Sequence, residues 1–254
     1  MAQVDRSFIG EGIIYARKYG SQDPFLDIGN CDTFNVAYAT EKRELKNFRG
    51  GGGNRNVKEQ VSGVTAAIGM YDLTPENIGR VTNSAIVSVP ATAIVNEQLI
   101  VGGVIGELIP FNHLPDTNQP VTVMTVVEAP EEGVALVAGT DYVLTPHGII
   151  SKSAAVTVAG VSVSYTPLKA SALHMLAGAP VELELYIAGL NDAQSGEPFS
   201  LRPRRAKFGL TSELPVFSQE YVKLASTVEL LADDLVQGAG ISKFCQMDVI
   251  DKVA

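Results

Sequence analysis

The segment LKNFRGGGGNRNVKEQVSG, residues 45–63, has the composition that most suggests chemistry. The four consecutive glycines Gly50–Gly53 lie among basic and amide side chains. Glycine-rich loops bind phosphate when they lead into a helix N-terminus, as in GxxxxGK[ST] or GxGxxG. Here the glycines are followed by Asn-Arg-Asn and then by residues typical of a strand. The sequence therefore predicts a flexible loop over residues 42–60 and no phosphate site.

The same segment carries an unusual concentration of positive charge. Six of the chain's 19 basic residues lie between Lys42 and Lys58, although the net charge is −9. A basic loop on an acidic protein suits docking onto an acidic surface of a neighbouring molecule. The alternative is a solvated hairpin loop.

Glu182 and Glu184 are the candidate carboxylate pair. Paired carboxylates hydrolyse glycosides, but the two groups normally converge from different elements across a cleft. Two glutamates at i and i+2 on one strand more often charge a surface. The basic cluster RPRRAK, residues 202–207, lacks the interleaved aromatic residues of a nucleic-acid site, and no serine lies in GxSxG. We therefore expect a protein that is not an enzyme.

Metal and cofactor chemistry is not predicted. Cys31 and Cys245 are far apart, the three histidines are scattered, and there is no CxxC or HExxH. We expect two ordinary, half-buried thiols, structural or surface histidines, and no cofactor.

The composition limits which other classes of protein this chain can belong to. Apolar residues make up 46% of 254 residues, and charged residues only 19%. An acidic balance argues against tight binding of nucleic acid, although it allows DNA to slide past without sticking. The N-terminus lacks the apolar core of a signal peptide, and no stretch approaches the roughly 18 apolar residues of a membrane span. We expect a soluble protein made in a cytoplasm.

The elements that must position these residues are mostly strands. Short runs rich in Val, Thr, Ile and Tyr are punctuated by Gly, Pro, Asn and Asp, which is typical of an all-β protein. Alternation predicts strands over residues 33–41, 61–71 and 181–191. In the second of these, one face carries only small residues, including Thr65, Ala67 and Gly69, which indicates close approach by another surface.

One short helix is predicted over residues 75–83. Thr74 suits the N-cap, Pro75 suits the first helical position, and Glu76 lies near the positive end of the helix dipole. The fold class is therefore all-β with one short helix.

The chain divides into a core and an insertion. Residues 1–87 and 171–254 are expected to form the core, and residues 88–170 to form an inserted β-rich segment. The sequence leaves open whether the insertion is a separate domain or an elaborated hairpin, and its role is not predicted.

Two stretches carry a resemblance to a known family. Residues 27–84, from DIGNCDTFN to PENIGRVTNS, contain in order Ile28-Gly29-Asn30, the glycine run, Asp72-Leu73 and Pro75-Glu76-Asn77. Residues 188–233, AGLNDAQSGEP to VELLAD, continue the pattern. In this arrangement the chain resembles the tail tube proteins of long-tailed bacteriophages, over roughly residues 10–85 and 175–250. Residues 88–170 depart from the compact family pattern.

The resemblance implies a fold and an assembly. The fold would be a β-sandwich or half-barrel, similar to the inner-tube protein of type VI secretion. Six such subunits form a ring whose inner strands complete a continuous β-barrel, and stacked rings form the virion's tail tube for genome ejection. Double-stranded DNA would pass through the lumen without specific binding. The implied partners are other copies of the chain, the tape measure protein, the tail terminator and baseplate proteins, with no membrane.

The resemblance also assigns residues. The loop would be an inter-ring assembly arm, with Arg49 and Arg55 as charge contacts. The arm residues are Lys46, Arg49, Gly50, Gly51, Gly52, Gly53, Arg55 and Lys58. The residues expected to face an acidic lumen that repels DNA are Thr65, Ala67, Gly69, Glu182 and Glu184.

An alternative reading is a soluble β-sandwich binding module that recognises a host surface or a glycan. Residues 88–170 would then be the recognition domain. The absence of tryptophan and the 7% aromatic content count against it.

Overall fold

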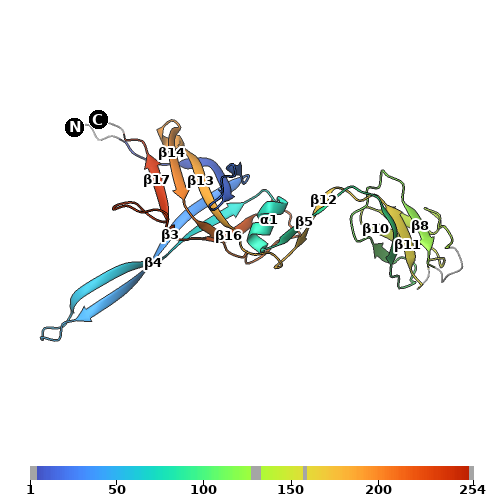
Figure 1. The fold of residues 1–254 in the computed structure, drawn as a ribbon, viewed down its shortest axis with the longest axis horizontal. Coiled ribbons are helices and arrows are strands. Elements are labelled where there is room, and N and C mark those ends of the chain that lie inside the picture. The colour runs from blue at the N-terminus through green and yellow to red at the C-terminus, as the bar shows by residue number, and fades with distance from the viewer. Residues whose placement is uncertain (1–4, 127–132, 157–158, 252–254) are drawn as a thin grey trace. The chain divides into compact units, whose positions relative to one another are not determined.

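The computed structural model describes residues 5–126, 133–156 and 159–251. It is an all-β protein with one α-helix, built from antiparallel sheets (Figure 1). The chain divides into two compact units, with unit 1 formed by residues 1–86 and 173–254 and unit 2 by residues 87–172. These boundaries lie within two residues of the expected ones.

Unit 1 is built on one large sheet. In chain order its strands are β1 (Gly10–Lys18), β2 (Leu26–Asp27), β3 (Cys31–Lys46), β4 (Asn54–Met70), β13 (Glu182–Asn191), β14 (Glu197–Pro203), β15 (Ala206–Phe208), β16 (Leu224–Leu230) and β17 (Cys245–Val249). The spatial order is β17-β14-β13-β15-β16-β4-β3, and β1 covers the other edge of β13. Among the described residues this sheet does not close into a barrel.

The sheet divides into two branches beside β13. The end of β13 near Asn191 pairs with β14, while its beginning at Glu182 pairs with β15. One branch continues from β14 to β17, and the other from β15 through β16 and β4 to β3.

Strict alternation places the core of unit 1 on one face of this sheet. Leu183, Leu185 and Ile187 of β13 are buried together with alternate residues of β16 and β4. In β4 these include Val64 and Ile68, as the sequence predicts. A period of two puts every intervening residue on the opposite face.

Unit 2 has a core of its own. Its strands are β6 (Ile94–Leu99), β7 (Leu108–Pro110), β8 (Thr122–Thr125), β9 (Tyr142–Thr145), β10 (Gly148–Ser151) and β11 (Val161–Tyr165). They form two three-stranded sheets, β7-β10-β9 and β6-β11-β8, which contribute to one hydrophobic cluster. Strands β5 (Ala85–Val89) and β12 (Ala170–His174), which contain the unit boundaries, pair as a two-stranded sheet.

The structure corrects the expected loop over residues 42–60. β3 and β4 pair from Cys31–Met70 out to Lys46–Asn54, with three shifts of register on the way, and only residues 47–53 lie between the two strands. Polar residues continue the strand because the opposite strand supplies hydrogen bonds to their backbone. The two strands extend beyond the rest of unit 1 as an arm (Figure 1), which we define as residues 39–62.

The helix α1 (Pro75–Thr82) begins and ends as expected to within one residue. Thr74 Oγ1 accepts a hydrogen bond from the Asn77 N–H at 3.2 Å, and Asn83 ends the helix in the left-handed conformation. Asn77 itself is buried. Its Nδ2 donates to the carbonyl oxygens of Ile28 at 2.7 Å and Asp72 at 2.9 Å.

Asn77 thus joins the short motifs that the sequence shows in order. Asp72 Oδ2 also accepts from the Asn30 N–H at 2.8 Å, and Gly29 has a φ of +95°. A Cβ at Gly29 would lie 2.3 Å from Asp72 Oδ2, so the turn needs glycine here. The helix, the turn before β3 and the end of β4 form one hydrogen-bonded junction.

We predict that Asn77→Leu destabilises unit 1 by about 1–3 kcal/mol, because the buried Ile28 carbonyl and the part-buried Asp72 carbonyl lose their donor. Hydrogen exchange measured by mass spectrometry would show faster exchange in β4 and β16. Strand β11 of unit 2 serves as the internal control, and exposed Leu190→Ala on β13 is the matched variant with little effect. Unchanged exchange in β4 would contradict the assigned role.

Candidate functional site

From β3 across β4, β16 and β15 to Glu184 of β13 and Arg17 of β1, the side chains on the face of the large sheet opposite the core are small, polar or charged. We call this region the polar face; beyond it, the same side of the sheet continues with Tyr186 of β13 and with Tyr15 and Ile13 of β1. Strand register places Asn35, Ala67 and Thr227 side by side across three strands. Its members are Arg17, Thr33, Asn35, Ala37, Thr65, Ala67, Gly69, Glu182, Glu184, Lys207, Ala225, Thr227 and Glu229, together with Arg205, which binds Glu182.

All five residues expected to face a lumen lie on this polar face. Thr65, Ala67 and Gly69 are on β4, while Glu182 and Glu184 are on β13. The intervening strands β16 and β15 connect them, with Thr65 opposite Glu229, Glu229 opposite Lys207, and Lys207 opposite Glu182.

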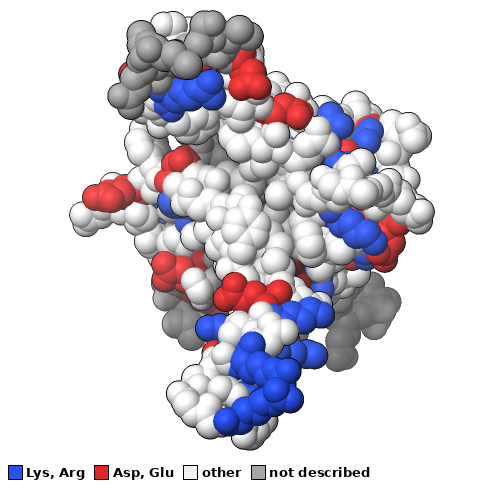
Figure 2. All heavy atoms as spheres, turned by 90° about the vertical axis from the view of Figure 1, so that its left-hand side faces the viewer, with Lys and Arg blue, Asp and Glu red and all other residues white. Residues whose placement is uncertain are grey.

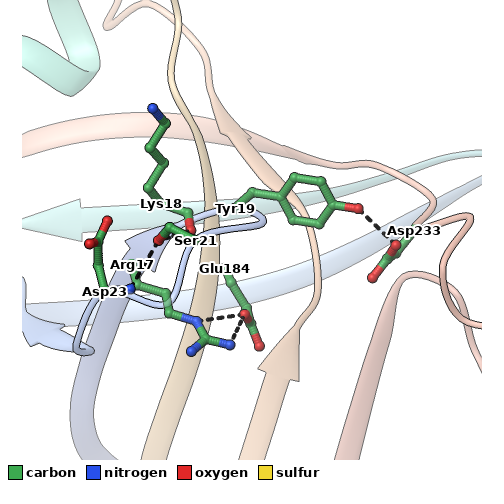
Figure 3. Close-up of polar contacts among 7 residues, drawn as sticks. All are labelled: Arg17, Lys18, Tyr19, Ser21, Asp23, Glu184 and Asp233. Atoms are coloured by element: carbon green, nitrogen blue, oxygen red, sulfur yellow. Dashed lines mark hydrogen bonds and ion pairs between the residues drawn. The ribbon is translucent and has the colours of Figure 1, made fainter.

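The acidic pair is neutralised by arginines, which the sequence analysis did not anticipate. Glu184 accepts from Arg17 Nε at 2.8 Å and Arg17 Nη2 at 2.6 Å (Figure 3). Glu182 is bound by Arg205 through two nitrogens, at 2.7 and 2.9 Å. Each arginine comes from a strand or turn beside β13, so the polar face is charge-balanced and not acidic.

Aromatic rings hold these arginines in place. The Arg17 guanidinium lies 4.4 Å from the Phe25 ring centre, and the Arg205 guanidinium lies 5.2 Å from that of Tyr19. The Tyr19 hydroxyl donates to Asp233 at 2.8 Å (Figure 3). This hydrogen bond to a carboxylate raises the pKa of Tyr19. Cation–π contacts and bidentate pairs give the face a fixed side-chain arrangement.

A further ion pair crosses the small-residue strip. Lys223 Nζ contacts Asp32 Oδ2 at 2.5 Å, and a Cβ at Gly69 would lie 2.1 Å from Lys223 Cε. This pair therefore passes directly over Gly69, and a larger residue there would displace the Lys223 or Asp32 side chain. The hydrogen bond from Lys223 lowers the pKa of Asp32.

The arm is the second candidate site. All its strand residues are exposed. Lys42 pairs with Glu44 and Arg43 with Glu41, whereas Lys46, Arg49, Arg55 and Lys58 have no salt bridge within the described residues. Basic side chains accordingly gather at the arm, at the bottom of Figure 2.

The arm's tip is a closed turn. Asn47 donates through its backbone to the Gly53 carbonyl at 3.0 Å and through Nδ2 to that of Gly50 at 2.8 Å. All four glycines have positive φ, between 70° and 90°. Phe48 beside them is 85% exposed. The tip presents cations and one aromatic ring, without the helix N-terminus that a phosphate loop uses.

The arm is poorly stabilised by its own contacts. It has no core on either face, and Arg43 lies directly opposite Lys58. A two-stranded hairpin is only marginally stable in water, and like charges across a pair destabilise it further. Its exposed Leu45 and Val57 add apolar surface. These features suit a segment that is stabilised by contact with another molecule.

Metal chemistry finds no support in the described part of the chain. No three His, Cys, Asp or Glu residues there are arranged to hold a metal ion. Both cysteines are free and half-buried, and burial raises the pKa of Cys31 to about 11. Over the same residues, no helix is long and apolar enough to span a membrane.

The protein family described as "Protein of unknown function UCP028589" matches residues 7–248. None of the curated proteins is significantly similar in sequence.

We predict that Arg205→Gln raises the pKa of Glu182, because the Arg205 hydrogen bonds are the main cause that holds this pKa below its ordinary value of 4.5. A depressed carboxyl pKa stabilises the fold above pH 4.5, and this contribution is lost as the pH falls through the folded pKa. Carbon-detected NMR titration of the glutamate carboxyls measures the shift. An identical Glu182 pKa in wild type and variant would contradict the pairing, and Arg202→Gln is the control.

Proposed function

This chain belongs to the family described as "Protein of unknown function UCP028589", and we propose that it is the structural subunit of a bacteriophage tail tube. Homohexameric rings of the chain would stack into a tube that conducts the genome into the host. The observation that carries the proposal is the polar face. From β3 to Glu184 of β13, one side of the sheet is apolar and packed, and the other side is small, polar and charge-balanced.

A channel lining for DNA needs such a surface. Small side chains leave a smooth wall, and cations already bound to carboxylates attract phosphates weakly. Arg17 and Arg205, each held by a glutamate, meet this condition. The lining proposed here is neutral, whereas Glu182 and Glu184 alone would give an acidic lining that repels DNA. A neutral lining also lets DNA pass without specific binding.

Free strand edges favour assembly. Within the described residues, β3 pairs only with β4, β17 only with β14, and β1 is covered on its second side only at Tyr15 and Ala16. Exposed edges are templates for pairing with another chain, and a closed ring removes them. In the proposed ring, strands of successive subunits complete a β-barrel with the polar face inward.

The arm would connect one ring to the next. Its unpaired cations suit the acidic remainder of the chain, because the arm carries six basic and three acidic residues on a protein of net charge −9. Tape measure, terminator and baseplate proteins are the further partners we propose, with the virion tail as the location. The binding-module alternative would assign the function to unit 2, which has its own core.

We predict that Arg49→Glu/Arg55→Glu leaves the protein folded and blocks tube growth, because the arm's tip loses its attraction for an acidic neighbour. Negative-stain electron microscopy counts tubes, and circular dichroism checks the fold. Lys152→Glu/Lys169→Glu in unit 2 changes the charge by the same amount and should leave tubes intact. Tubes of normal length from the arm variant would refute this role for the arm.

A further inference from the structure

Unit 1 has a groove between its two sheet branches, and its wall is partly apolar and partly polar. The groove encloses about 340 Å³. Residues of β3, β14 and β17 are among those that line it. Its apolar lining residues are Phe8, Ile14, Phe34, Ile187, Phe199, Leu201 and Met247, and its polar ones are Glu11, Asp32, Thr33 and Asn35.

The β14–β17 branch is only partly covered on its inner face, where the Phe8 ring packs against the Phe199 ring with the ring centres 4.9 Å apart. Register places Leu201 opposite Met247 and Phe199 opposite Val249 on the side that continues from buried Ile187. Met247 is nevertheless 50% exposed and Val249 is 63% exposed. The Phe199 ring covers Gly189, where a Cβ would lie 2.1 Å from it. This branch therefore presents a sheet face of core composition to solvent.

Unit 1 also carries an exposed apolar loop. The segment LPVFSQEY, residues 214–221, lies between β15 and β16. Phe217 is 96% exposed, Tyr221 95% and Val216 75%, although aromatic side chains are usually at least partly covered. No other described loop of unit 1 exposes two aromatic rings so completely.

The loop is held at both ends. Before its tip, the Thr211 N–H donates to the Val81 carbonyl at 2.8 Å, and Leu214 packs against the core. After its tip, Lys223 is bound to Asp32, which itself lines the groove. The loop thus ends near the rim of the groove in its own chain, but neither Phe217 nor Tyr221 lines that groove. An aromatic tip on fixed ends is pre-organised for binding, which lowers the entropy lost on association.

We propose that the loop of residues 214–221 inserts its tip into the groove of a second copy of the chain. A groove of about 340 Å³ accommodates an aromatic side chain such as Phe217. The loop and the groove are different surfaces of one molecule, so the contact is heterologous and propagates around a ring. Edge strands β3 and β17 line the groove, which places the contact beside the backbone groups that a neighbour can pair with. This inference rests on the proposed function for its reason to assemble, and it names the contact between subunits within one ring.

The test is site-specific photocrosslinking from position 217. Phe217 is replaced by benzoylphenylalanine in the full chain, the purified protein is irradiated at high concentration, and crosslinked peptides are mapped by mass spectrometry. We expect covalent dimers linked to peptides that contain Phe34, Leu201 or Met247. Dimers linked elsewhere, links only within one chain, adducts with a bound small molecule or the absence of dimers would each overturn the inference.

A matched pair of variants provides a second measurement. Met247→Glu places a charge in the groove wall and should raise the protein concentration needed for assembly by roughly tenfold or more, as for loss of a central contact. Met175→Glu is the control, because Met175 is similarly exposed at 54% but lies outside the groove lining. Equal assembly of the two variants would count against the groove.

The outcomes separate this inference from the proposed function. Hollow tubes whose crosslinks from position 217 map outside the groove would refute the inference alone. Groove-linked dimers or closed rings that never form a tube would support the inference and refute the tube.

Discussion

The pairing of β3 with β4 is the interaction on which the rest of unit 1 depends. At one end, this ladder places Phe34, Ile68 and Met70 against the core, and at the other it carries the arm beyond it. The two strands stay paired through both regions, with irregularities in register at three points, while side-chain burial on β3 ends before Tyr38. The same ladder is therefore a core element at its base and an exposed hairpin at its tip, and in the proposed tube the adjacent ring covers that hairpin.

Other parts of unit 1 also have a well-connected backbone but exposed apolar side chains. The β14–β17 branch has strand partners but no layer over Met247 and Val249, and the loop at Phe217 has anchored ends but nothing over its tip. Monomeric proteins rarely leave apolar surface of this kind uncovered. The polar face is different, because its arginines form ion pairs with Glu182 and Glu184 within the same chain. The proposed tube wall needs a subunit of this kind, with one face whose charges are already paired and with strand edges that remain free for pairing with neighbouring subunits.

Local sequence patterns predicted the strand faces and the start of the helix. The length of the arm and the ion pairs of the polar face depend on contacts between distant residues, and these were not predicted. Alternation identified Val64, Ile68 and Leu183 as one face of their strands, and Thr74-Pro75 identified the start of α1, because period and capping are local properties. The length of the arm strands was missed because Lys, Glu and Asn have low strand propensity and are held there by the opposite strand. The arginine partners of Glu182 and Glu184 were missed because Arg17 is 167 residues from Glu184. Arg205 was recognised as part of the basic cluster RPRRAK. Its pairing with Glu182 could not be predicted, because it depends on the register between β13 and β15. Asn77 was visible only as part of a motif, and its burial beneath Ile28 and Asp72 gives that motif a physical reason.

The central claim is that the polar face lines a channel. Cryo-electron microscopy of the purified protein, concentrated until it assembles, tests this most directly. The account predicts hollow tubes of sixfold rings in which Thr65, Ala67 and Glu182 face the central channel and the arm reaches the adjacent ring. An assembly in which these residues lie on the outer surface, or a protein that remains monomeric at every concentration, would contradict it.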